Sequence, residues 1–283
     1  MKTKMIAVMA GLAVGSLAAG TALGATLEFK DPTGDDNGPG TYVYPTDGVY
    51  SPGSFDMTEF EVTSKGKDAE FKVCFNSSLD DPWGMGVGFA VQMAAIYIDT
   101  DRAPGSGHMD GLAGFNIKFA PGDGWEKVVV LSPQQQSRVM SEAKMKASSE
   151  LAAGDLLVPR RTLGKGKCIS GRVKLEDLAP TADGAPNPAG WGYQVAIQSN
   201  EGFPAKTDLL TRRVNEFEGQ HRFGGGHDMD CDPHVMDILA PPAAGGADEV
   251  AAQHEMLSYE CDADGNAVKS ATLRMVPGTD GAK

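Results

Sequence analysis

The chain has 283 residues, and its 38 Asp and Glu against 25 Lys and Arg give a formal net charge of −13. A surface this acidic repels phosphate backbones, so the composition argues against a nucleic-acid partner. It suits divalent cations or neutral ligands, although the same charge also keeps an exported protein soluble.

The N-terminus has the layout of a secretory signal peptide. Lys2 and Lys4 precede an apolar run over residues 5–19, and small residues lead to a cleavage point after Gly24 or Ala25. The run is shorter than the roughly 20 apolar residues of a membrane span. We expect a signal peptide over residues 1–25, one domain over 26–283, and a periplasmic, cell-surface or extracellular location. An uncleaved N-terminal anchor is the alternative.

Strand signals recur along the rest of the chain. Residues 60–63 and 70–75 flank a polar turn, which predicts a hairpin. Residues 94–98 and 128–131 are continuously apolar and are expected to be buried strands. The alternation over residues 191–198 predicts a strand with one buried face. The pattern favours a mainly β protein, with residues 273–276 as a further strand of the same sheet.

One segment has the composition of a helix instead. Ser132 is a suitable N-cap, Pro133 suits the first helical position, and Gly154 suits a stop. We expect a single α-helix near residues 134–151, inserted in the β architecture.

The four cysteines are even in number, which in an exported chain favours two disulfides with three possible connectivities. We prefer Cys74–Cys168, because both lie on strand-like stretches, and Cys231–Cys261, which would tie an acidic loop to the C-terminal segment. No C-x-x-C spacing supports a zinc or thioredoxin-type site, and no C-x-x-C-H motif supports haem attachment.

An ordered set of motifs resembles the C-terminal binding module of glucodextranase, which is also attached to pullulanase-type enzymes. The resemblance spans about residues 27–277. It is carried by FKDPTGDDNGPG from Phe29 with TYVYP from Thr41, IDTD from Ile98 with GSG from Gly105, WGY from Trp191, FGGGHD from Phe223, and DP at 232 with DILAP at 237.

This resemblance implies an antiparallel β-sandwich related to DOMON-like domains and family-9 carbohydrate-binding modules, of jelly-roll type. It also implies that the chain binds carbohydrate or a cell-surface glycan rather than cleaving it. The printed residues contain no stretch that resembles a glycosidase catalytic domain, so the resemblance leaves the ligand open. The expected partners are a polysaccharide or cell-wall glycan, together with a separately encoded glycoside hydrolase.

Acidic loops are the candidates for metal binding. Calcium takes 6–8 oxygen ligands, which flexible Gly- and Asp-rich loops supply. Asp31, Asp35 and Asp36 lie among glycines in the first such loop. We expect calcium ligands in two later loops, formed by Asp99, Asp101 and Asp110 and by Asp228, Asp230 and Asp232. Asp99 and Asp101 are the first choice. None of these loops is an EF-hand, and the alternative is turn chemistry without an ion.

Aromatic residues in loops are the candidates for glycan contacts, because sugar rings stack on exposed aromatic faces. Tyr42, Tyr44 and Trp83 lie in glycine- or proline-rich stretches and are the expected contacts. Trp191 and Tyr193 lie on an alternating strand and are expected in the core.

Catalytic and cofactor motifs are missing from the sequence. It contains no Gly-x-Ser-x-Gly elbow, and His254-Glu255 lacks the second histidine of a zincin. The glycines at 84, 86 and 88 are no nucleotide fingerprint. We therefore expect a protein that is not an enzyme and binds neither nucleotide nor flavin.

Two alternatives to glycan binding remain. One is a structural envelope protein that mediates protein contacts. The other is a DOMON-like electron-transfer protein that holds haem through Met or His ligands, for which the candidates are Met85, Met93, His108, His227 and His234.

Overall fold

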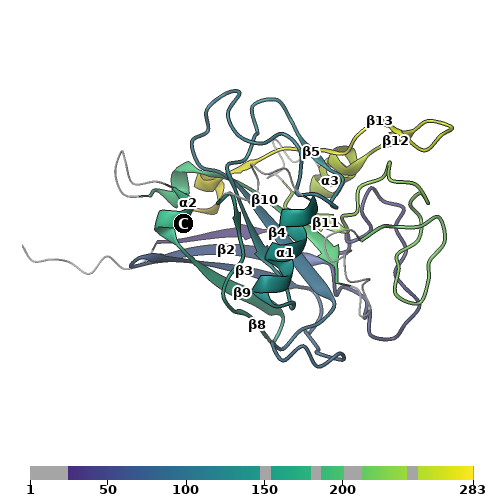
Figure 1. Cartoon of the computed structure of the whole chain (residues 1–283), viewed down its shortest axis with the longest axis horizontal. Helices are drawn as coiled ribbons and strands as arrows, with labels where there is room; N and C mark the ends of the chain where they lie inside the picture. The colour runs from purple at the N-terminus through teal and green to yellow at the C-terminus, as the bar shows by residue number, and fades with distance from the viewer. Residues whose placement is uncertain (1–24, 147–153, 180–185, 201–211, 241–247, 283) are drawn as a thin grey trace, which may run out of the picture.

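The computed structural model describes residues 25–146, 154–179, 186–200, 212–240 and 248–282 (Figure 1). Two β-sheets pack face to face, and short helices and long loops cover the remaining faces. The predicted β-sandwich is therefore confirmed. Residues 1–24 of the expected signal peptide lie outside the described residues. Within the described ranges, no helix has both the length and the apolar character needed to cross a bilayer.

The first sheet has five antiparallel strands. Its order is β1 (Thr26–Lys30), β2 (Met57–Lys65), β3 (Asp68–Phe75), β9 (Cys168–Lys174) and β8 (Thr162–Lys165). Strands β2 and β3 form the predicted hairpin. Gly66 takes a φ of 64° in its turn, a conformation that glycine adopts without steric cost.

The second sheet contains the most deeply buried strands. Its order is β11 (Asp237–Ile238), β10 (Gly192–Ser199), β4 (Gln92–Asp99), β6 (Lys127–Leu131) and β7 (Leu156–Leu157), and β15 (Val276–Pro277) also pairs with β10. Two small sheets complete the fold, formed by β5 (Lys118–Phe119) with β14 (Thr272–Leu273), and by β12 (Glu260–Cys261) with β13 (Ala267–Lys269). The expected strand over residues 273–276 is split between β14 and β15, and only β15 joins the sheet of β10.

Two apolar cores lie on opposite faces of the second sheet. Between the sheets, Phe60 and Phe71 of the first sheet pack with residues such as Ile96 and Val195 of the second. On the outer face, Tyr97 packs beneath the loop 109–125 and two helices. Every residue of β4 and β10 is consequently buried. The predicted burial of residues 94–98 and 128–131 is confirmed, but the prediction of one exposed face for 191–198 is wrong.

Three α-helices flank the sheets in the described part of the chain, rather than one. Helix α1 (Gln136–Lys146) begins two residues later than expected. Residues 147–153, at the end of that prediction, lie outside the described part of the chain. Helix α2 (Leu175–Leu178) and helix α3 (Glu249–Leu257) were not predicted, although the Asp248 side chain caps α3 by accepting a hydrogen bond from the Val250 N–H.

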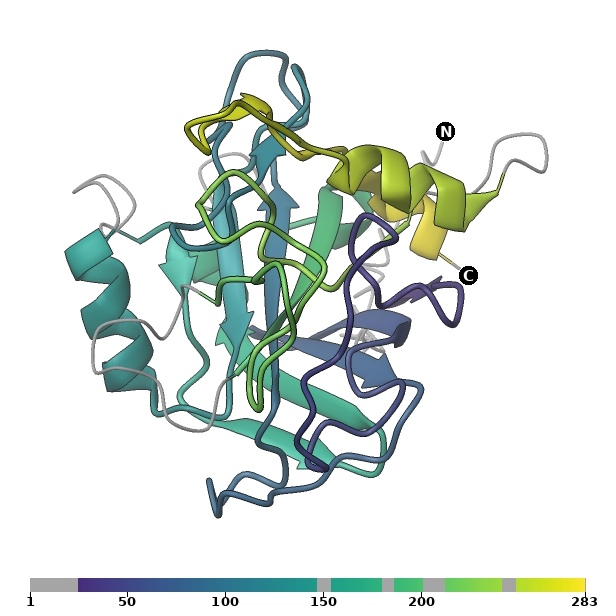
Figure 2. The same cartoon turned by 90° about the vertical axis from the view of Figure 1, so that its right-hand side faces the viewer.

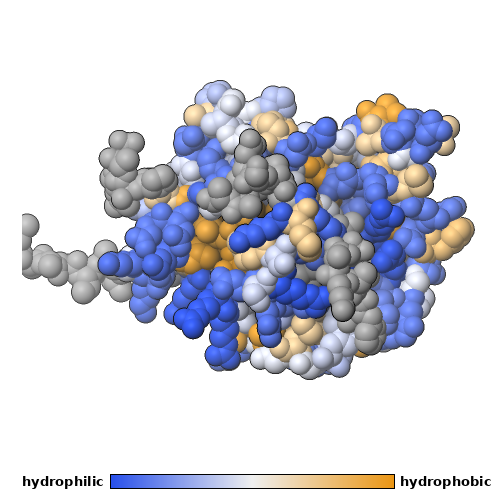
Figure 3. Space-filling model, viewed as in Figure 1, coloured by the Kyte–Doolittle hydropathy of each residue, from blue (hydrophilic) through white to orange (hydrophobic). Residues whose placement is uncertain are grey.

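The face that carries α1 is largely hydrophilic, as the net charge leads one to expect, with an apolar area between α2 and α1 (Figure 3). In that region Met140, Leu156 and Leu157 line a shallow pocket of about 380 Å³ with Arg160 and Arg172.

Both preferred disulfides are confirmed. Cys74 and Cys168 are partners in the register of β3 and β9, with Cα atoms 4.0 Å apart. Cys231 and Cys261 have Cα atoms 5.7 Å apart and join the loop before β11 to β12. Because the second bridge spans 30 residues, it restricts the unfolded chain considerably.

We predict that the double variant Cys231→Ala/Cys261→Ala loses about 3 kcal/mol of unfolding free energy, since a loop of this size gives that entropic stabilisation. Guanidinium titration of the oxidised proteins measures the loss as a lower denaturation midpoint. Wild type treated with reductant is the companion sample. An unchanged midpoint would show that the bridge does not stabilise the fold.

Candidate functional site

Two long loops lie side by side at one end of the sandwich. Figure 2 looks onto this end and shows the purple loop after β1 beside the green loop that precedes β11. Val43 and Gly224 exchange two backbone hydrogen bonds of 2.9 and 3.0 Å. Gly225 has a φ of 83°, and a Cβ there would lie 2.1 Å from the Thr41 carbonyl oxygen. The glycine run that follows Phe223 is thus required by the close approach of the two loops.

Aromatic side chains fill the space where these loops meet a third loop, between β3 and β4. Trp83 from the third loop packs edge to face on Tyr50, with ring centroids 6.2 Å apart, and on His221 at 6.3 Å. Beneath them, Phe55 packs on Phe223 at 5.1 Å. Trp83 is half-buried, so part of its ring faces solvent.

The Trp83 loop is fixed by its own turn chemistry. The Asp81 carboxylate accepts hydrogen bonds from the N–H groups of Met85 and Gly86, at 2.7 and 2.8 Å. Gly84 has a φ of 63° and donates its N–H to the Asp81 carbonyl. An aspartate that bonds the following backbone is a common stabiliser of turns. Trp83 is therefore held in one position without a ligand.

Polar groups surround the aromatic cluster. The Thr46 and Asp47 N–H groups donate to the carbonyls of Gly219 and Gln220, at 3.0 and 3.1 Å. The Gln220 side chain returns a hydrogen bond to the Asp47 carboxylate at 3.0 Å. The same loop carries Phe217, whose side chain is 74% exposed. An aromatic surface bordered by carboxylate and amide groups can hold the apolar face and the hydroxyls of a sugar together.

The predicted aromatic contacts are only partly accessible. Tyr42 is buried and donates its hydroxyl to the Pro233 carbonyl at 2.6 Å, so the expectation of an exposed ring is wrong. Tyr44 is half-buried and donates its hydroxyl to Asp36. Trp83 keeps part of its surface open. Phe217 and His221 were not predicted, because neither lies in an alternating stretch or in one of the quoted motifs.

The first predicted metal loop is assembled in part. Oxygen atoms of Asp99, Asp101 and Glu126 all lie within 4.8 Å of one another. Burial raises the pKa of Asp99 and of Glu126. Arg102 lies 3.6 Å from Asp99, however, and provides a positive charge already. Asp110 is exposed, and its backbone forms an isolated β-bridge with that of Lys118. It does not belong to this group of carboxylates.

The second predicted metal loop does not converge. Asp228 accepts the Glu216 N–H at 3.0 Å, and Asp230 pairs with Arg213 at 2.7 Å. Asp232 points inward instead and is fully buried. The structure therefore does not bring the three carboxylates together, and calcium binding by this loop stays a prediction.

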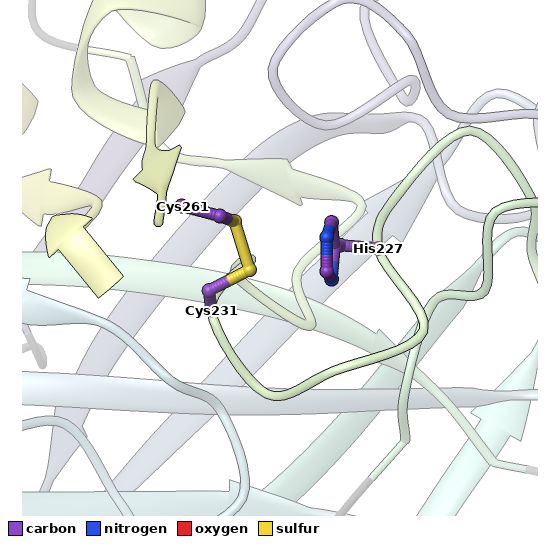
Figure 4. A group of neighbouring side chains, drawn as sticks. All are labelled: His227, Cys231 and Cys261. Carbon is purple, nitrogen blue, oxygen red and sulfur yellow. A yellow bond between two sulfur atoms is a disulfide. The ribbon is translucent and has the colours of Figure 1, made fainter. Parts of the chain in front are cut away.

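His227 lies close to Cys231 and Cys261 (Figure 4). The two sulfur atoms are joined in a disulfide, so they have no thiolate to offer a metal. The His227 ring is also engaged, because its Nδ1 accepts the Met229 N–H at 3.1 Å. In this oxidised state Cys231 and Cys261 form a structural cross-link, and His227 lies beside it.

The residues considered as haem ligands have other roles in the fold. His108 Nε2 lies 3.0 Å from the Asp155 carboxylate, and His234 Nδ1 lies 3.0 Å from the Gly114 carbonyl. Met93 is fully buried in the outer core, and Met85 lies in the Trp83 turn. The structure thus gives no observation that favours haem for these side chains.

A third acidic group is more deeply buried than either predicted one. Asp31, Asp35, Asp56 and Asp237 are 9%, 0%, 1% and 0% exposed, and oxygen atoms of Asp31, Asp35 and Asp237 lie within 4.8 Å of one another. Burial raises the pKa of Asp35 to about 7, and burial with the neighbouring charges raises the pKa of Asp31 and Asp237 well above the usual range. Only Asp31 and Asp35 belong to the Gly- and Asp-rich loop that the sequence marks.

The comparisons with known proteins agree with the resemblance noted from the motifs. The family model of the SLH-like C-terminal binding module of glucodextranase matches residues 26–276. No curated protein matches the chain.

The buried Asp232 predicts a pH dependence of stability. Burial raises the pKa of its carboxyl to about 7 from an ordinary 3.8, and the groups that face it are the Tyr42 hydroxyl, Tyr259, Asp230 and His234. Because the folded state holds this proton more tightly than the unfolded state, its contribution to stability falls as pH rises from about 4 to 7.

We predict that Asp232→Asn flattens the fall in unfolding free energy over this pH range by up to about 1.4 kcal/mol per pH unit. Burial lowers the pKa of His234, whose effect has the opposite sign, and His234 remains in both proteins. The difference between variant and wild type, measured by urea titration at several pH values, therefore isolates Asp232. Parallel pH profiles would contradict the prediction.

Proposed function

The chain belongs to the family of the SLH-like C-terminal binding module of glucodextranase, and from this membership we propose that it is an exported, non-catalytic module that binds a polysaccharide or cell-wall glycan. The family is one of binding modules, which favours binding without catalysis. Two disulfides and this membership together suggest an extracellular or cell-surface location. A glycoside hydrolase, encoded separately or attached, is the enzyme partner that the family suggests.

The observation that carries the glycan proposal is the half-exposed Trp83 ring on its rigid turn. A ring that is already held in place loses little conformational entropy when a ligand stacks on it. Phe217 offers a second apolar surface on the neighbouring loop. Asp47 and Gln220 place a carboxylate and an amide in the loops around them, and such groups hydrogen-bond sugar hydroxyls.

The shape of this end of the molecule supports long ligands more than small ones. Trp83, which is partly buried, and Phe217, which is exposed, lie on two neighbouring loops, and the pocket beside Phe29 and Asp31 lacks an exposed aromatic ring. Apolar rings on neighbouring loops suit consecutive units of a polymer chain. We therefore propose that the ligand is a polysaccharide, with Trp83 stacking on one sugar unit.

We predict that Trp83→Ala weakens retention on the ligand polysaccharide by on the order of tenfold, since truncating a central aromatic contact commonly costs at least 1–2 kcal/mol. Affinity electrophoresis over a panel of dextran, pullulan and cell-wall glycans measures the retention. Phe217→Ala is expected to show a smaller loss, because its side chain has less support from neighbouring rings.

The matched control is Val268→Ala, which removes an exposed apolar side chain on β13, outside the aromatic cluster. It should leave retention unchanged. If wild type migrates freely through every gel of the panel, or if Trp83→Ala is retained as strongly as wild type, the proposed glycan surface is wrong. An absorbance scan of the same preparations tests the haem alternative, for which a Soret band is the positive result.

A further inference from the structure

Three segments bring four aspartates to the seam between the two sheets. Asp31 and Asp35 lie in the loop after β1, Asp56 directly precedes β2, and Asp237 belongs to β11. The Asp237 carboxylate of β11 reaches across to the other sheet, where it accepts the Met57 N–H of β2 at 2.6 Å. This carboxylate thus links the start of β2 in the first sheet to β11 in the second.

Two of the carboxylates are anchored through one oxygen and have no hydrogen-bond partner on the other. Asp31 accepts the Ala240 N–H through Oδ1 at 2.9 Å, and Asp56 accepts the Gly34 N–H through Oδ2 at 2.9 Å. Their second oxygens, Asp31 Oδ2 and Asp56 Oδ1, are buried without a hydrogen-bond partner, as are both oxygens of Asp35. Asp237 differs, because its Oδ2 accepts the Met57 N–H and its Oδ1 accepts the Ile238 N–H at 2.8 Å.

No cationic side chain balances this group. Among the residues that the structure describes, none of the salt bridges involves Asp31, Asp35, Asp56 or Asp237. Ionised carboxylates removed from water need a counter-charge or a proton, because burial without either is strongly unfavourable. A bound cation satisfies the bare oxygens and the missing charge at once.

The geometry selects the type of cation. Two oxygens bonded to one Ca²⁺ at about 2.3–2.6 Å lie at most about 5 Å apart. The oxygens of Asp31, Asp35 and Asp237 meet this limit, since all lie within 4.8 Å. The donor set contains carboxylates without histidine or thiolate, which suits a hard cation rather than zinc. The glycine-rich loop allows the irregular coordination that Ca²⁺ accepts and Mg²⁺ does not.

The Asp99 group differs in these same respects. Asp101 is exposed, and its Oδ1 accepts hydrogen bonds from the Ala103 N–H and the Ser106 hydroxyl, both at 2.8 Å. Arg102 supplies a positive charge beside Asp99. Asp101 thus has hydrogen-bond donors and Asp99 has a counter-charge, so this group provides the matched control for the buried one.

We propose that Asp31, Asp35 and Asp237 bind one calcium ion, with Asp56 as a fourth carboxylate beside them. The ion ties the loop after β1 to the start of β2 and to β11, and so fastens the two sheets at their common edge. A pocket of about 420 Å³ opens beside Asp31 and gives the ion a route from solvent. This site is separate from the calcium ligands expected from the sequence, and it stands whether or not the module binds glycan.

The test compares thermal unfolding and titration calorimetry of EDTA-stripped protein with CaCl₂. We expect calcium at a hundredfold excess over its Kd to raise the Tm of wild type by roughly 5 °C. Asp35→Asn should lose both the Tm response and the heat of binding. The metal-free variant should unfold at a temperature no lower than metal-free wild type, because the substitution removes a buried charge at nearly constant volume.

Asp31→Asn is the second variant, and it should weaken calcium binding at least tenfold. Asp101→Asn is the control and should respond to calcium as wild type does. A purely structural role for Asp35 would shift the Tm equally with and without calcium, and would leave the binding heat intact. The proposal is overturned if calcium gives wild type neither heat nor Tm shift, if Asp35→Asn binds calcium as wild type does, or if Asp101→Asn abolishes binding.

Discussion

The pairing of β4 with β10 is the constraint on which the fold depends, because both strands are buried on both faces. A sheet in this position needs a cover on each side. The first sheet covers one face, and the loop 109–125 with helices α1 and α3 covers the other. Part of the second cover is irregular chain whose backbone groups must also be satisfied. The surface proposed for glycan binding lies at the loop-bearing end of the sandwich.

Buried glutamine side chains on β10 donate hydrogen bonds to backbone carbonyls of these covering segments. Gln194 donates to the carbonyls of Leu239 and Arg274, and Gln198 donates to those of Gly114 and His234. Each glutamine thus fastens two covering segments to the central strand. Their role explains why a polar position in an alternating strand is buried here: the side chain replaces the water that the covered loops have lost.

The periodicity of the sequence predicted the β2–β3 hairpin, because the alternation of apolar residues is a local signal. The family resemblance implied the sandwich. Both disulfides were preferred from the places of the four cysteines, although Cys74 and Cys168 are 94 residues apart. The burial of β10 depended on loops more than 30 residues away, which periodicity does not reveal. The structure also separates Asp228 and Asp230, each of which contacts a different partner on the loop surface. Asp56 lies in no motif, and Asp237 was marked only as the first residue of the DILAP motif. Their approach to Asp31 and Asp35 could not be predicted, since contacts between separate segments exist only in the fold.

The buried carboxylates and the aromatic cluster are physically connected. The Tyr44 hydroxyl donates to Asp36 of the acidic loop and accepts the Phe55 N–H, and Phe55 directly precedes Asp56. Tyr44 also packs on Phe223, beneath the loop that carries Phe217. A cation that fixes the acidic loop would therefore reduce the freedom of the rings that support Trp83, and the entropy lost on glycan binding would fall accordingly. Coupling of this kind acts through the reduced conformational freedom of these rings, without direct contact between the cation and the glycan. It predicts that calcium strengthens glycan binding while Trp83 itself contributes nothing to calcium affinity.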